Sequence, residues 1–151
     1  KVEPFLLERY RYVLEQKRQL NGATFRIAAT YQALLLATGG GAFAVIERTL
    51  NESVPVLFAL LCLRALTIFV LLLGAFGALM VASGIVSWLK YRRDEADIEV
   101  QVYSSARPAP VVRNIFRWYE TYILMMIVVS SSVAAAVIHF FAIPLVRAAG
   151  G

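Results

Sequence analysis

The sequence predicts an all-α integral membrane protein with three transmembrane helices, an N-terminal amphipathic helix and a cytoplasmic connection that can hold a short strand. Of its 151 residues, 60% are hydrophobic and only 17% are charged. Soluble domains average about 45–50% apolar and about 25% charged residues. Three stretches are long and apolar enough to cross a bilayer, and Lys and Arg are distributed unequally between the segments that join them. The same composition excludes a disordered chain.

The predicted spans follow from the lengths of the apolar stretches, because a helix needs about 20 residues to cross the hydrocarbon core. The second stretch is longer than one crossing, since an apolar extension precedes Arg64. The third carries its single acid, Glu120, near its start. These stretches divide the chain into seven segments. The three spans are residues 27–46, residues 55–89 (which include the apolar extension) and residues 118–146. The cytoplasmic segments are the amphipathic helix (1–26) and the connection (90–117), and the outer segments are the loop (47–54) and the tail (147–151).

Lys and Arg are concentrated on one side of the predicted spans. Residues 1–26 carry six of them and residues 90–117 another six, whereas the outer loop has only Arg48 and the outer tail only Arg147. Cytoplasmic segments are enriched in basic residues, so we predict a cytoplasmic N-terminus and an outer C-terminus. The basic flanks are expected to contact anionic lipids rather than nucleic acid. An aromatic belt at the cytoplasmic interface agrees with this orientation; it consists of Trp88, Tyr91, Trp118, Tyr119 and Tyr122.

An amphipathic helix is predicted before the first span, over residues 4–20. Pro4 suits a first helical turn, and an apolar stripe follows at spacings of four and three residues; it contains Leu6, Tyr10, Val13, Lys17 and Leu20. The helix either rests on the membrane surface or packs against neighbours in an oligomer. Asn21-Gly22 can bend the chain before the first span, although a continuous helix from Pro4 to Ile46 is also compatible with the pattern.

The cytoplasmic connection changes character along its length. Residues 90–99 are highly charged and are expected to extend the second helix beyond the membrane. Ile98, Val100 and Val102 then alternate with more polar residues, and this period of two favours a strand. Prolines after Arg107 end it, since proline cannot donate to a strand ladder. The segment is either an extended linker or a strand that pairs with another chain.

Small residues at helical spacing predict close helix packing in the second and third spans. Lipid tails are as apolar as leucine, so helices associate in membranes through close approach at small residues. The predicted packing residues are Gly74, Gly77, Ala78, Ala82, Gly84, Ser130, Ser131, Ala134 and Ala135. The pattern does not decide between contacts within one chain and between chains. The run Gly39-Gly40-Gly41 in the first span indicates either close packing with local flexibility or a kink or pore-lining segment.

Three ionisable residues near the outer side are candidates for a pore or an ion pair. Arg64 precedes Leu89 by 25 residues, about 37 Å along a helix, which places it near the outer boundary. It can snorkel to the head groups, pair with Glu47 or Glu52, or line the mouth of a pore. His139 lies near the outer end of the third span, where it can bond to a serine or to a backbone carbonyl. A proton relay through it would need a second titratable group in the membrane.

The sequence contains no catalytic constellation, so we expect a protein that is not an enzyme and needs no cofactor. The single cysteine, Cys62, excludes a disulfide framework and a multi-cysteine zinc site. The single histidine, His139, excludes a histidine-pair metal motif. The glycine run is not a phosphate loop, because no strand precedes it and no Lys-Ser or Lys-Thr pair follows.

The run Glu8-Arg9-Tyr10-Arg11-Tyr12-Val13-Leu14-Glu15-Gln16, followed by Leu20-Asn21, Phe25 and Tyr31-Gln32, occupies most of the first 40 residues. In these residues the chain resembles the RipA-like octameric bacterial membrane proteins. The resemblance implies a homo-oligomer in the bacterial inner membrane and carries over no active-site residue. Three functions are open: a homo-oligomer that acts as a channel or scaffold, an accessory subunit of a larger transporter or membrane enzyme, and an effector that perturbs the bilayer.

Overall fold

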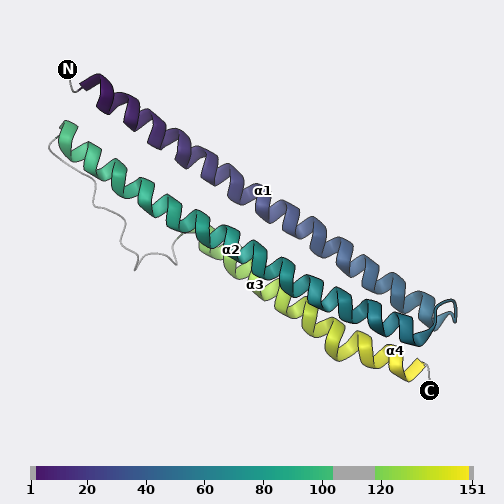
Figure 1. Ribbon diagram of the computed structural model, residues 1–151. Helices are drawn as coiled ribbons and strands as arrows, with labels where there is room; N and C mark the ends of the chain where they lie inside the picture. The colour runs from purple at the N-terminus through teal and green to yellow at the C-terminus, as the bar shows by residue number, and fades with distance from the viewer. Residues whose placement is uncertain (1–2, 104–117, 150–151) are drawn as a thin grey trace. The chain divides into compact units, whose positions relative to one another are not determined.

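The computed structural model describes residues 3–103 and 118–149, and throughout this part the chain is helical apart from one turn and the residue before α3 (Figure 1). The elements are α1 (Glu3–Leu50), α2 (Val56–Tyr103), α3 (Tyr119–Val137), the π-helical segment η2 (Ile138–Ala142) and α4 (Ile143–Ala149). Three helical stretches are long and apolar enough to cross a membrane: Leu7–Leu50, Val56–Val100 and Tyr119–Ala149. The prediction of three such helices is therefore confirmed.

The turn between α1 and α2 is shorter than the predicted outer loop, because α1 continues to Leu50. Glu52 adopts a left-handed conformation with φ 56°. Its amide donates to the Thr49 carbonyl at 3.1 Å, and the Ser53 amide donates to the Arg48 carbonyl at 2.9 Å. This pair of bonds is the Schellman motif that ends many helices, with Glu52 in the place usually taken by glycine. Pro55 directly precedes α2. The chain reverses direction at this turn (Figure 1).

The helices belong to two compact units. Unit 1 contains the described residues of 1–27 and 79–124, and unit 2 contains those of 28–78 and 125–151. In unit 2, buried side chains recur on each helix at spacings of three, four and seven, which is the pattern of helices packed along a narrow seam. Its core cluster consists of Ala42, Ala59, Leu63, Ile138, Ala142, Ile143 and Val146. Many large apolar side chains outside the seam are exposed, including Leu36, Leu57 and Phe141, as in a protein whose surroundings are lipid.

Unit 1 joins the N-terminal half of α1 to the C-terminal half of α2. α1 has no break at Asn21-Gly22, so the continuous helix that the sequence left open is the one observed. Lys17 of α1 contacts Glu95 of α2, and Thr24 lies near Gly84. The amphipathic segment is therefore packed against α2 of the same chain.

The prediction of a strand from the alternation that begins at Ile98 is wrong within the described residues, because α2 continues as a helix through Tyr103. Glu95 and Ile98 are both buried, three residues apart, whereas Val100 is exposed. The burial thus follows a helical period, and the alternation is too short to specify a strand. Residues 104–117, which include the prolines after Arg107, lie outside the described residues.

The third predicted span continues to Ala149 but is not a uniform α-helix. In η2 the Ile143 amide bonds to the Ile138 carbonyl, five residues back. Pro144 follows directly and has no amide hydrogen to give to the Phe140 carbonyl, so the regular i→i−4 ladder is interrupted at this point.

Candidate helix-packing site and interfacial charge cluster

Tyr31 is the centre of a buried hydroxyl cluster that joins α1 to α3 in unit 2. Only 3% of the residue is exposed. Its phenol oxygen lies 2.7 Å from the hydroxyl oxygens of both Ser130 and Ser131, and it can donate to the Ile127 carbonyl at 3.1 Å. A polar side chain in the first predicted span therefore meets two of the predicted packing residues of the third.

The hydroxyl protons of this cluster can all be used within it. Ser130 can donate to the Met126 carbonyl at 2.6 Å, and Ser131 can donate either to the Ile127 carbonyl at 2.8 Å or to Tyr31. Each hydroxyl has one proton and two acceptor sites. If Ser131 donates to Tyr31, Tyr31 can donate to Ser130, which donates to the backbone. A closed network of this kind avoids the cost of an unpaired polar group in an apolar environment.

Glycines of α2 make this close approach possible. A Cβ atom at Gly74 would lie 2.1 Å from the Ser131 hydroxyl oxygen, and one at Gly77 would lie 3.4 Å from the Ile127 side chain. The first distance is impossible without movement, so any larger residue at Gly74 would require Ser131 to shift. In unit 1, Gly84 has a looser neighbour, with 3.9 Å from a Cβ to the Thr24 hydroxyl oxygen.

The remaining predicted packing residues have differing surroundings. Ala135 is buried, and Ala78 and Ala82 are half-buried. Ala134 is half-buried and lines a groove.

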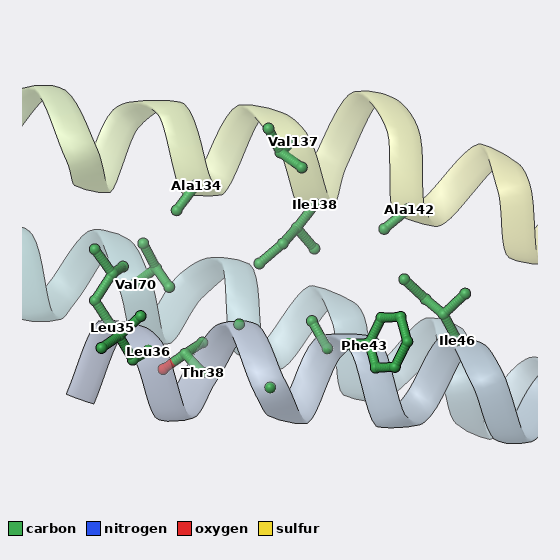
Figure 2. A pocket seen from close by; sticks show the side chains of 13 residues that line it. Leu35, Leu36, Thr38, Phe43, Ile46, Val70, Ala134, Val137, Ile138 and Ala142 are labelled. Atoms are coloured by element: carbon green, nitrogen blue, oxygen red, sulfur yellow. The ribbon is translucent and has the colours of Figure 1, made fainter. Parts of the chain in front are cut away.

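The groove lies in unit 2 beside the glycine run of α1, with a volume of about 490 Å³. Figure 2 shows Ala134, Ile138 and Ala142 on one side, facing side chains of α1 across it. Thr38 is its one polar side chain, and the Thr38 hydroxyl donates to the Leu34 carbonyl at 2.7 Å. Its lining residues are Leu35, Leu36, Thr38, Gly39, Gly40, Ala42, Phe43, Ile46, Val70, Ala134, Val137, Ile138 and Ala142. No atom of the described residues would lie within 4 Å of a Cβ at Gly39, Gly40 or Gly41, apart from those of the local helix.

Among the described residues, no ion pair joins any two of the three predicted pore or ion-pair residues. Arg64, Glu47 and His139 are all exposed. The His139 ring contacts Phe140 edge to face, with 4.9 Å between the ring centroids.

Unit 1 holds a charge cluster that the sequence analysis did not single out. The Lys17 ammonium of α1 lies 2.7 Å from Oε2 of Glu95, and Arg92 binds the same oxygen. The ammonium also lies 6.0 Å from the centre of the Trp88 ring, which packs at 4.9 Å against Trp118. One feature of the sequence could have indicated this cluster: Lys17 is a charged residue at a position of the apolar stripe.

The carboxylate of Glu95 is held in its charged form by this cluster. Burial by itself raises the pKa of Glu95, but hydrogen bonds from Lys17 and Arg92 and their positive charges lower it more. The net pKa lies below the ordinary value of 4.5. Glu95 therefore stays ionised at neutral pH and ties α1 to α2.

The chain matches no protein-family model, and no curated protein or solved structure is significantly similar to it.

Proposed function

We propose that the chain is a non-enzymatic membrane protein that self-associates and acts as a scaffold. The groove beside the glycine run of α1 carries this proposal. The groove adjoins the core cluster, with which it shares Ala42, Ile138 and Ala142, and its lining is almost entirely apolar. A second copy of the chain is the proposed occupant, seated over Gly39 and Gly40.

A comparison of two sets of glycines in unit 2 supports a partner outside the chain. Gly74 and Gly77 meet side chains of the same chain, so their small size is used in the fold. Gly39, Gly40 and Gly41 meet none, although each weakens a helix by about 1 kcal/mol relative to alanine. Glycine lets another helix backbone come close, which an adaptable lipid tail does not require. The resemblance to the RipA-like proteins supports self-association in a bacterial inner membrane, and the distribution of Lys and Arg supports an N-terminus in the cytoplasm.

A scaffold is favoured over a channel because the interior of unit 2 is closed. Leu63, Val70 and Ile127 are among the most deeply buried side chains, and the hydroxyls beside them bond within the cluster. A conducting path would have to run between copies of the chain.

The proposal is tested by the mass of the purified protein in lipid nanodiscs, measured for the wild type and two variants. A Cβ atom at Gly40 would meet nothing within 4 Å, and Gly40 lines the groove, so Gly40→Leu can place its side chain in the groove; it should lower the number of copies in the assembly and leave the fold unchanged. Ala37→Leu is the matched control, because Ala37 is exposed on α1 and does not line the groove.

A wild-type protein that is monomeric would contradict self-association. An unchanged mass in Gly40→Leu would place the contact between copies elsewhere. Loss of a different co-purifying subunit in Gly40→Leu would favour the accessory-subunit function instead.

A further inference from the structure

The charge cluster of unit 1 presents positive charge outward. The side chains of Lys17 and Arg92 are 19% and 20% exposed, whereas that of Glu95 is only 5% exposed. Two cations share one carboxylate, so the cluster has a net charge of +1. What a ligand can reach is therefore the cationic part.

Both cations keep hydrogen-bond donors beyond those given to Glu95. An ammonium has three N–H groups and a guanidinium five. Within the described residues each side chain makes one hydrogen bond, and both go to Oε2 of Glu95. Two cations fixed beside each other, with donors to spare, suit a phosphate group, which accepts several charge-assisted hydrogen bonds.

The cluster lies at the level where lipid phosphates are found. Trp88 stands near the end of the uncharged run of α2, and tryptophan prefers the membrane interface. Arg92 follows it by four residues, about 6 Å along the helix. The head-group layer on each side of the hydrocarbon core is about 5–8 Å thick. Lys17 is brought to the same level by its position over the Trp88 ring.

We propose that Lys17 and Arg92, held beside each other by Glu95, bind the phosphate of an anionic phospholipid next to Trp88. This site rests on the proposed membrane location of the protein. Glu95 acts as a positioning residue, because it fixes both cations without reaching the ligand. A lipid fits better than a dissolved phosphate, since α2 exposes the large apolar side chains of Leu79, Met80 and Val86 before Trp88, and these can receive the lipid tails.

Fluorescence of the full chain in vesicles tests the proposal directly. Trp88 and Trp118 are the two tryptophans of the sequence, and they are in contact with each other. Vesicles of phosphatidylglycerol and phosphatidylcholine are prepared with bromine on the tails of one lipid or the other, so that quenching reports which lipid adjoins the site. The wild type should prefer phosphatidylglycerol by about fivefold or more, and millimolar inorganic phosphate should not remove the preference.

A triple variant, Lys17→Met, Arg92→Met and Glu95→Met, removes the site without leaving a buried unpaired charge. Apolar replacement of a buried ion cluster is often neutral for stability, and circular dichroism checks that the helices remain. The triple variant lowers the net charge by one, as does Lys90→Met, in which an exposed cation of the same region is removed. We expect the preference for phosphatidylglycerol to disappear in the triple variant, so that the two lipids quench about equally. The preference should persist in Lys90→Met.

Equal loss of preference in the two variants, or its survival in the triple variant, would overturn the site and leave only a general basic surface. Removal of the preference by inorganic phosphate would assign the cluster to a soluble anion and also contradict the proposal. Absence of quenching by either brominated lipid would instead refute the membrane location on which the site rests.

Discussion

The two units join helices by different chemistry. In unit 2 the contact depends on size and on neutral hydroxyls, since Gly74 lets Ser131 approach and Tyr31 bonds across to α3. In unit 1 the contact between α1 and α2 depends on charge and on aromatic rings, through Lys17, Glu95 and Trp88. The first kind suits a site without water, where charges are costly, and the second suits the interface, where charged groups remain partly hydrated. The two units thus show that one chain can join its helices by either kind of contact.

The largest effect is expected at Gly74. A methyl group there would overlap Ser131, and overpacking costs about 1–3 kcal/mol, so Gly74→Ala should lower the thermal midpoint in detergent. Gly22→Ala, on α1 and outside the groove, is the matched control because its methyl group meets no side chain. It should stabilise α1 by about 1 kcal/mol through helix propensity. A midpoint for Gly74→Ala at or above that of the wild type would show that unit 2 is not held by close approach.

A comparable effect, which depends on pH, is expected at Glu95. The folded pKa of this carboxyl is lowered, so its contribution to stability is present above the ordinary pKa and is lost as the pH falls through that value toward the folded pKa. Glu95→Gln should cost about 1–3 kcal/mol at pH 7. The difference from the wild type should shrink when unfolding is measured below pH 4.5. A difference that is independent of pH would mean that the ion pair contributes nothing measurable.

The smallest effect is expected at Tyr31. In Tyr31→Phe the hydroxyl is lost, but Ser130 and Ser131 retain bonds to their own backbone carbonyls. The cost should therefore be that of one net hydrogen bond, about 1 kcal/mol, without dependence on pH between 4 and 8. Comparison of Tyr31→Phe with Glu95→Gln distinguishes the stability contributed by a neutral hydrogen bond between helices from that contributed by an ion pair. A loss of several kcal/mol would indicate that the serines depend on Tyr31.

The sequence predicted the three long helices well, because apolar stretches of this length have few alternatives. It failed where the structure depends on contacts distant in the chain or on the geometry of a single turn. Helical burial at Ile98 overrode a short alternating pattern, and a Schellman motif at Glu52 shortened the expected outer loop. Gly74 and Ser131 were predicted as packing residues, but their partnership and that of Tyr31 with Ser131 could not be read from spacing. Lys17 and Glu95 are 78 residues apart, and only the position of Lys17 on an apolar stripe hinted at a buried partner.

Cross-linking in native membranes tests the proposed contact between copies most directly. The sequence has one cysteine, Cys62, so a Cys62→Ala background allows single new cysteines to be compared. Gly40→Cys lies in the open groove, and Ala37→Cys is exposed on α1 outside it. Mild oxidation should give a disulfide-linked dimer from Gly40→Cys and little from Ala37→Cys. Equal cross-linking at both positions, or none at Gly40→Cys, would contradict self-association through the groove.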